Sequence, residues 1–357
     1  MKPAPIAGLI KIALFAHRLS YFSIPSNAAH VDQTIHCDVE LSSEHNQSGA
    51  ITSPNYPHQY PANIRCSYRF RSKGSERVQL IFTDFDLHVQ PDQDDSPHLC
   101  RGEFDHFSAY VDLDGRMSEI DTFCGSEIPP QLMSSRNFLA AELVTHSRHG
   151  QLKRTYRGFR LIYKFTDDFG ITTGWKDSKH ACSFYYGSAE ASNGTFHSPN
   201  YPGYYPRKTE CHYTFDGAPN QKVRLTFTYF DVEGFGQCDN ESQSDFIEFS
   251  NYRTMDRKLP RYCGSRRPPE KGVESENDYY HVIFSSNSIF DGTGFFGFYQ
   301  FINKEGKHPL RKVKSKANSV HLPSHPRSSS LFYVSPLWLV ISADHVFRHR
   351  WSSLHNA

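Results

Sequence analysis

Eight cysteines, which fall into two sets of four, constrain the fold of this chain most. The first and second cysteines are 29 residues apart in both sets, and the third and fourth are 24 residues apart in one set and 25 in the other. No C-x-x-C occurs, which disfavours zinc and thioredoxin-like sites. An even number in repeated spacing favours disulfides and an oxidising compartment, although spacing alone leaves three connectivities within each set. The residues are Cys37, Cys66, Cys100, Cys124, Cys182, Cys211, Cys238 and Cys263.

The cysteines belong to a longer internal repeat. With an offset of 145 residues, "TSPNYP" from Thr52 aligns with "HSPNYP" from His197. Further along, the offset falls to 139, so that Cys124 aligns with Cys263. One unit of about 125 residues therefore occurs twice, and its length is that of a domain and not of a solenoid repeat. The two prolines of each "SPNYP" fix backbone angles, which predicts a rigid connection between strands.

Both copies show the pattern of β-strands. Apolar residues alternate with other residues from Val78 to Phe82 and again from Val223 to Phe227. Period-two runs of this kind predict half-buried strands, and turn residues interrupt them about every ten residues. Many short strands with such turns favour an all-β sandwich or barrel in each copy.

The N-terminal segment and three sequons predict an extracellular protein. Residues 1–29 are typical of a signal peptide, with Lys2, an apolar stretch and small residues that end at Ala29; a mis-assigned start is the alternative. Three N-x-[ST] sequons lie in polar stretches and are candidate glycosylation sites in a secreted protein. These are Asn46, Asn193 and Asn240.

Residues 303–357 predict a disordered basic tail, rich in lysine and arginine with serine, proline and histidine between them. Its apolar segment, Leu331 to Ala343, is too short to span a bilayer. This segment is interpreted as an interfacial anchor or as sequence from an atypical transcript. The basic stretch from Lys307 to Lys316 favours a solvated linker, with contact to anionic lipid or glycosaminoglycan as the alternative.

The sequence disfavours enzymes and nucleic-acid-binding proteins. It contains no H-E-x-x-H, G-x-S-x-G or P-loop motif, and its net charge is only +1. The twenty histidines are interpreted as surface or loop residues. We therefore predict a protein with no catalytic residues and no nucleic-acid partner.

The quoted motifs resemble the CUB domain. Each unit has four cysteines, an early "SPNYP", a central "FD" after an alternating strand, "CG" at the fourth cysteine and a closing "GF". The resemblance implies two tandem antiparallel β-sandwiches of jelly-roll-like topology, at 37–166 and 182–302, joined by a linker at 167–181. It also implies that the first cysteine pairs with the second and the third with the fourth, which gives Cys37–Cys66, Cys100–Cys124, Cys182–Cys211 and Cys238–Cys263.

Many CUB domains bind Ca²⁺ through acidic side chains at one end of the sandwich, and the resemblance implies such a site in the second copy. Its ligands would be Glu233 in "FDVE", Asp245 in "SDF" and Asn287 in "FSSN". Calcium prefers six to eight oxygen ligands, which carboxylate and amide groups supply. In the first copy His88 replaces the glutamate, so a site there is disfavoured.

The second copy is also similar to the suppressor-of-lurcher proteins, which are related to the neuropilin and tolloid-like receptor partners. The similarity lies in "NGTFHSPNYPGYYPRKTECHYTF", "FTYFDVEG" and "SSNSIFDGTGFFGFYQF". It implies an extracellular protein-binding function as an auxiliary subunit or regulator of ionotropic glutamate receptors. The alternatives are a secreted modulator of an extracellular protease or growth factor, similar to the procollagen-proteinase enhancers, and a non-catalytic fragment of a tolloid-like protease.

Overall fold

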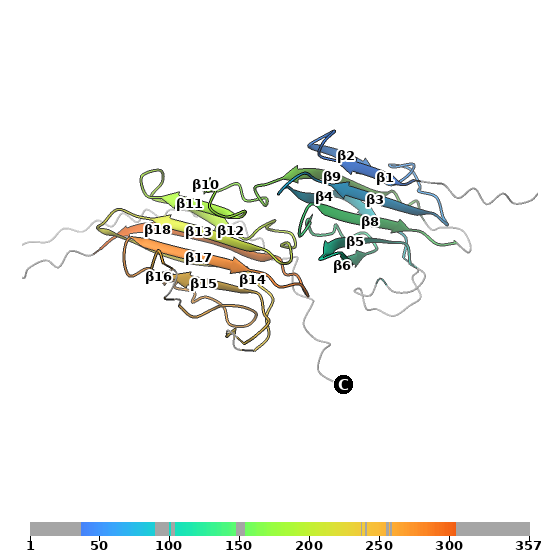
Figure 1. The fold of residues 1–357 in the computed structure, drawn as a ribbon. Coiled ribbons are helices and arrows are strands. Elements are labelled where there is room, and N and C mark those ends of the chain that lie inside the picture. Colours follow the sequence, from blue (N-terminus) through green and yellow to red (C-terminus); the bar gives the residue numbers. More distant parts are fainter. Residues whose placement is uncertain are drawn as a thin grey trace, which may run out of the picture. The chain divides into compact units, whose positions relative to one another are not determined.

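The computed structural model describes residues 37–89, 100, 104–147, 154–236, 238–239, 241–254, 257 and 259–304. Every regular element in these ranges is a β-strand, and they form two domains (Figure 1). None of the described residues belongs to a helix that could cross a membrane. The expected signal peptide and most of the expected basic tail lie outside the described residues.

Domain 1 consists of two β-sheets. The five-stranded sheet has the order β1-β3-β8-β5-β6, and the four-stranded sheet has the order β2-β9-β4-β7. The strands are β1 (Val39–Ser42), β2 (Ser48–Thr52), β3 (Arg65–Arg71), β4 (Arg77–Asp86), β5 (His106–Leu113), β6 (Arg116–Phe123), β7 (Leu132–Met133), β8 (Phe138–Val144) and β9 (Gly158–Thr166).

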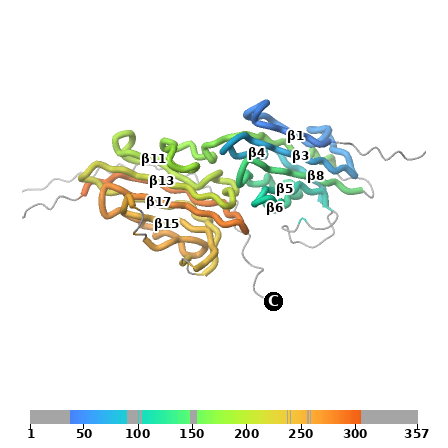
Figure 2. Tube along the Cα trace, viewed as in Figure 1, coloured from blue at the N-terminus to red at the C-terminus, as the bar shows by residue number. Residues whose placement is uncertain are grey.

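Domain 2 repeats this arrangement except at the edges of its five-stranded sheet, where β10 is added beside β11 and the described residues form no strand in the position of β6. One sheet has the order β10-β11-β13-β17-β15, and the other has the order β12-β18-β14-β16. Figure 2 shows β13 between β11 and β17, with β15 on the far side of β17. The strands are β10 (Trp175–Lys176), β11 (Ser183–Gly187), β12 (Asn193–His197), β13 (Glu210–Asp216), β14 (Gln221–Asp231), β15 (Phe246–Ser250), β16 (Val273–Glu274), β17 (Tyr279–Ser285) and β18 (Gly294–Asn303).

One strand pair in each domain is parallel, whereas the resemblance implied antiparallel sheets. β1 pairs with β3 in a register that places Val39 opposite Tyr68, and β11 pairs with β13 so that Ser183 lies opposite His212. Both registers have an offset of 29 residues, which is also the spacing of Cys37 from Cys66 and of Cys182 from Cys211. Each disulfide therefore joins the two strands at their starting ends, and both strands run in the same direction from it.

The structure contains four disulfides, in the pairing that the resemblance implies. Besides the two at the parallel pairs, Cys100 bonds with Cys124 and Cys238 bonds with Cys263. The described residues contain no free cysteine. A disulfide that closes a loop of 24 to 29 residues restricts the unfolded chain and typically contributes about 3 kcal/mol.

Aromatic and aliphatic side chains fill the space between the two sheets of each domain. The alternation predicted for β4 and β14 is confirmed, because Val78, Leu80, Val223 and Leu225 are fully buried. In domain 2, the side chain of Phe196 packs against four aromatic side chains from three other strands, namely Tyr213, Phe215, Phe227 and Phe295. The cores thus form from the inward faces of the strands, and β17 is buried on both faces.

The "SPNYP" segments connect the strands β2 and β12 to the rest of each domain. Asn55 and Asn200 have positive φ angles of 65° and 56°, a conformation that asparagine tolerates better than most residues. The second segment also contacts domain 1. The side-chain oxygen of Asn200 accepts a hydrogen bond of 2.8 Å from Gln79, and its amide donates to the carbonyl of Gln131 at 3.0 Å.

Part of the segment expected to be a linker, 167–181, belongs to the fold of domain 2. Phe169 and Ile171 are buried in its hydrophobic core. Trp175 and Lys176 form β10, which pairs with β11 at the edge of the sheet. Because both contacts fix the backbone, these residues have less freedom than a solvated linker would have.

Candidate functional site

The candidate site in domain 2 is built around a buried carboxylate, Asp245. This residue precedes β15 and is 0% exposed. The hydroxyl of Tyr205 donates a hydrogen bond of 2.6 Å to Oδ2 of Asp245. The same hydroxyl accepts a 3.0 Å hydrogen bond from the backbone N–H of Glu233. Tyr205 therefore fixes the carboxylate relative to the loop that follows β14.

The three residues expected at a calcium site are close together. The backbone N–H of Asn287, which follows β17, donates to Oδ1 of Asp245 at 2.5 Å. The side-chain amide of Asn287 donates to Oε2 of Glu233 at 3.2 Å, and to the carbonyl of Gln243 at 2.8 Å. Two loops, β14–β15 with Glu233 and Asp245 at its two ends and β17–β18 with Asn287, therefore bring the three residues together.

Burial disfavours the charged form of Asp245. It raises the pKa of this carboxyl to about 7, and the negative charge of Glu233 acts in the same direction. Hydrogen bonds from Tyr205 and from the backbone of Asn287 oppose the rise. A carboxyl with this pKa is about half protonated at neutral pH, so a cation that binds here would displace a proton.

The donor set fits a divalent cation only in part. Glu233 and Asp245 supply carboxylate oxygens of the kind that Ca²⁺ prefers. The third group is a neutral amide, and its nitrogen, not its oxygen, faces Glu233. The described residues contain no group of three or more His, Cys, Asp or Glu side chains arranged to hold a metal. For Asn287 to act as a ligand, its amide would have to rotate by half a turn.

Exposed apolar side chains lie in the same two loops as Glu233 and Asn287. Phe235 is 67% exposed, Ile289 is 48% exposed and Phe290 is 55% exposed. Next to Asn287 there is a pocket of about 380 Å³, which Phe246 and Ile289 also line. We call the set Glu233, Phe235, Asp245, Asn287, Ile289 and Phe290 the loop end of domain 2. It combines exposed apolar groups with acidic ones, which is typical of a protein-binding surface.

A buried ion pair holds the β17–β18 loop in place. Arg207 forms hydrogen bonds of 2.8 Å and 2.6 Å with the carboxylate of Asp291, and both side chains are almost fully buried. A bidentate pair of this kind fixes both partners in orientation. The exposed side chains of Ile289 and Phe290 therefore project from a loop that is anchored immediately after them.

Domain 1 has the same hydrogen bonds between a tyrosine, an aspartate and two backbone N–H groups, but other side chains occupy the positions of Glu233 and Asn287. The hydroxyl of Tyr60 donates to Asp105 at 2.8 Å, and the backbone N–H groups of His88 and His146 bond to Tyr60 and Asp105. His88 therefore stands in the position of Glu233, as the sequence predicted, and His146 stands in the position of Asn287. Only one carboxylate remains, which is a poor donor set for calcium.

Sequence reasoning missed a cluster of buried histidines in domain 2. His212 on β13 and His281 on β17 are mostly buried, and their Nδ1 and Nε2 atoms lie 3.0 Å apart. His197 on β12 is buried as well. The expectation of surface or loop positions is wrong for these three residues. Each of the three directly neighbours core residues along its strand, so alternation places its side chain on the face opposite the core, and the sequence carried no signal for its burial.

The structure describes two of the three candidate glycosylation residues. Asn46 lies in the exposed turn before β2, and Asn193 is the exposed first residue of β12. Asn240 lies outside the described residues. Exposure of both described side chains is compatible with a bulky sugar.

Comparison with known families identifies the two domains. The family described as "CUB domain" matches residues 37–163 and 182–299. Cubilin from dog is 31% identical over 252 residues, which are 70% of this chain and 6% of that protein. Human procollagen C-endopeptidase enhancer 1 is 27% identical over 316 residues, which are 87% of this chain and 63% of that protein. The chain thus spans less than two thirds of either relative.

A solved structure, that of the MASP-1 CUB2 domain bound to Ca²⁺, is also similar. It is 24% identical, it aligns with 36% of this chain and 99% of that domain, and the TM-score is 0.27. The disulfide-bonded domains and the relatives place the chain outside the cell, as a secreted or cell-surface protein. Because the family match covers more than half of the chain, this protein belongs to the CUB-domain family and contains two CUB domains in tandem.

Proposed function

We propose that this chain is a non-catalytic extracellular binding protein whose protein partner docks on the loop end of domain 2. The observation that carries the proposal is the exposure of Phe235, Ile289 and Phe290 in the same two loops as the half-buried Glu233 and Asn287. Large apolar groups on a fixed loop lose little conformational freedom on binding, and aromatic anchors often supply most of the binding energy. The half-buried carboxylate of Glu233 favours a partner that presents a lysine or arginine beside it.

The narrower proposal is that the partner is an ionotropic glutamate receptor and that the chain is its auxiliary subunit or regulator. The similarity of the second domain to suppressor-of-lurcher proteins supports this proposal. The runner-up is a modulator of an extracellular protease or growth factor, which the similarity to procollagen C-endopeptidase enhancer 1 over 87% of this chain favours. A non-catalytic fragment of a tolloid-like protease is the third alternative, and a protease module in a longer transcript would identify it.

Affinity purification of the secreted full chain separates these alternatives. The tagged chain is added to intact receptor-bearing tissue, cross-linked, recovered and analysed by mass spectrometry. We expect an ionotropic glutamate receptor subunit among the cross-linked proteins. Recovery of collagen or protease partners with no channel subunit contradicts the narrower proposal and supports the runner-up.

We also propose that Ca²⁺ binds at the loop end of domain 2 through Glu233, Asp245 and the carboxamide oxygen of Asn287. The two carboxylates are already held in place by hydrogen bonds, and one of them is buried. One neutral ligand in place of a third charge predicts weak binding. When bound, the cation would fix the loops that carry Phe235 and Phe290.

Calorimetry tests the calcium proposal. Millimolar calcium should raise the melting temperature of the full chain, because a ligand at ten times its Kd stabilises the folded state by about 1.4 kcal/mol. The shift should be larger at pH 8 than at pH 6, since protons compete for Asp245, whose pKa is about 7. Glu233→Gln should abolish the shift, whereas Glu270→Gln, at an exposed position outside the loop end, should retain it. An unchanged melting temperature of the wild-type chain at millimolar calcium would refute calcium binding.

A further inference from the structure

The outer face of one sheet in domain 2 carries a row of aromatic side chains. Phe298 contacts Phe296 with ring centroids 5.6 Å apart, and Phe296 contacts Tyr201 at 5.4 Å. Tyr201 in turn contacts Tyr229 at 5.5 Å. Phe298 is the exposed end of this row, at 45%. A contiguous apolar row on the outside of a sheet is a candidate contact surface.

The corresponding face of domain 1 is ionic. There Asp84 takes the position of Tyr229, and Arg160 takes the position of Phe296. Arg157 forms hydrogen bonds of 2.8 Å and 3.0 Å with Asp84, and Tyr56 bonds to the same carboxylate at 3.0 Å. The aromatic row is therefore specific to domain 2.

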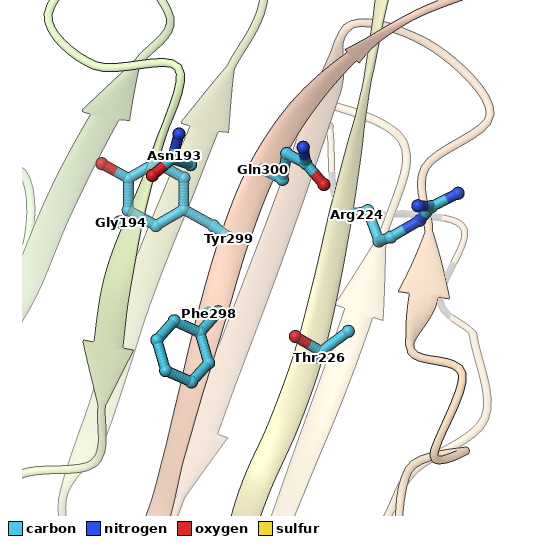
Figure 3. A pocket seen from close by; sticks show the side chains of 7 residues that line it. All are labelled: Asn193, Gly194, Arg224, Thr226, Phe298, Tyr299 and Gln300. Atoms are coloured by element: carbon cyan, nitrogen blue, oxygen red, sulfur yellow. The ribbon is translucent and has the colours of Figure 1, made fainter. Parts of the chain in front are cut away.

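A sequon lies on the same face as the aromatic row. In the register of β12 with β18, Asn193 lies opposite Gln300 and Thr195 lies opposite Phe298. Residues directly opposite one another share a face, and the diagonal neighbours Asn193 and Phe298 are about 7–8 Å apart. Figure 3 shows Asn193 and the ring of Phe298 to the left of β18 and Arg224 and Thr226 to its right; the registers place all four on one face of the sheet.

These side chains line a pocket of about 190 Å³. Phe298 supplies an apolar surface, and Gln300, Thr226 and Arg224 supply polar groups. Arg224 is held by hydrogen bonds of 2.8 Å and 2.6 Å to Glu274 on β16. One apolar wall and several polar groups match the two kinds of surface that a sugar ring presents, namely its C–H face and its hydroxyl and acetamide groups.

We propose that an N-linked glycan on Asn193 lies in this pocket and covers Phe298 with its first N-acetylglucosamine. In the attachment, Nδ2 of Asn193 loses a proton and bonds to C1 of the sugar, while the bond from C1 to its lipid pyrophosphate donor breaks. The glycan closes this face of domain 2 to protein partners, which leaves the loop end for them. In domain 1, Ser48 takes the position of Asn193 and is the last residue of the Asn46 sequon, and half-buried Ile162 takes the position of Phe298. Neither a glycan-bearing asparagine nor an exposed ring is therefore present at these two positions.

Nuclear magnetic resonance of the full secreted chain tests the proposal, with N-acetylglucosamine labelled with ¹³C. Mass spectrometry should find Asn193 glycosylated. The signals of the Asn193 glycan are identified as those that disappear in Asn193→Gln. They should lie upfield of the signals from other glycans, because the aromatic ring of Phe298 shields sugar protons that lie above its face. Phe298→Leu should remove this upfield shift. Phe235→Leu, at another exposed phenylalanine, should leave it unchanged.

Two results would overturn the proposal. One is an unmodified Asn193 in the secreted chain. The other is a glycan on Asn193 whose signals have the same shifts in the wild-type chain and in Phe298→Leu. An unchanged melting temperature of Phe298→Leu shows that the variant is folded, so that a lost shift reports the missing ring. Neither result depends on whether the loop end binds a partner.

Discussion

A close contact between Ser198 and Gly294 links the "SPNYP" segment to β18, the last strand of domain 2. Ser198 is fully buried, and its Oγ accepts a hydrogen bond of 3.0 Å from the backbone N–H of Phe295. Gly294 has a φ of 81°, and a Cβ at this position would overlap the Ser198 side chain. Ser53 and Gly158 repeat the contact in domain 1. The serine of the proline-rich segment and the glycine of "GF" therefore depend on each other.

Gly294→Ala should destabilise domain 2 by about 2–4 kcal/mol, because it adds both backbone strain and an overlap. Gly236→Ala is the matched control. Gly236 has a φ of 70°, but a Cβ there would have nothing within 4 Å. This control should cost only about 1 kcal/mol. Denaturant unfolding measures both, and equal losses in the two variants would contradict the proposed overlap.

Sequence motifs singled out three of the six residues of the loop end, but not the hydrogen bonds between them. "FDVE", "SDF" and "FSSN" singled out Glu233, Asp245 and Asn287, and the structure brings these together. The direction of the Asn287 amide could not be predicted, because it depends on the carbonyl of Gln243 in another loop. The exposure of Phe290 likewise depends on how the Arg207–Asp291 pair anchors its loop.

At the scale of elements, the strands β13 and β17 bring together histidines that are distant in sequence. The Nε2 atom of His212 lies 2.9 Å from Glu210, and Nδ1 of His281 lies 3.0 Å from the hydroxyl of Tyr279. His180, from the segment before β11, stacks on His212 with ring centroids 4.0 Å apart. Burial lowers the pKa values of His212 and His281. The nearby His180 lowers both further, and His212 also lowers the pKa of His281.

This cluster predicts loss of stability in acid. Burial, followed by the neighbouring His212, His180 and Lys179, lowers the pKa of His281 to about 4, whereas an unfolded histidine has a pKa of about 6.5. The unfolded state therefore binds the proton more readily between these values. The stabilisation is fully present above pH 6.5 and is lost as the pH falls towards 4, by on the order of 2–3 kcal/mol.

His281→Gln should flatten the pH dependence of the free energy of unfolding between pH 6.5 and 4. His58→Gln, which changes an exposed histidine of domain 1, should leave the dependence as in the wild-type chain. Urea unfolding at a series of pH values gives both slopes. If the wild-type chain and His281→Gln lose stability equally over this range, His281 does not titrate as we infer.

Strand content was predictable from alternation, but strand pairing was only partly so. Val78 and Leu80 marked β4 because the two faces of that strand differ in burial. The 29-residue spacing of Cys37 and Cys66 matches the parallel register of β1 with β3. The spacing alone could not predict this pairing, because three disulfide connectivities are possible within each set of four cysteines. The two-residue strand β10 carries no periodic signal, and it was therefore expected to be linker.

At the scale of the whole molecule, two copies of one fold differ where function is expected. Domain 1 has imidazoles at the positions of Glu233 and Asn287, and an ionic outer face. Domain 2 has acidic groups and exposed phenylalanines at its loop end, and an aromatic face beside a sequon. The shared frame gives stability to both domains, and the differing side chains favour domain 2 as the one that binds a partner.

Binding of the full chain to the protein recovered by cross-linking is the most direct test of this account. Phe290→Ser removes an exposed anchor of the loop end, and Ile128→Ser removes a comparably exposed apolar group of domain 1, at 54%. We predict that Phe290→Ser raises Kd at least about tenfold, as loss of an interface anchor does, and that Ile128→Ser leaves it unchanged. A wild-type Kd for Phe290→Ser, or an equal loss in both variants, would contradict binding through the loop end of domain 2.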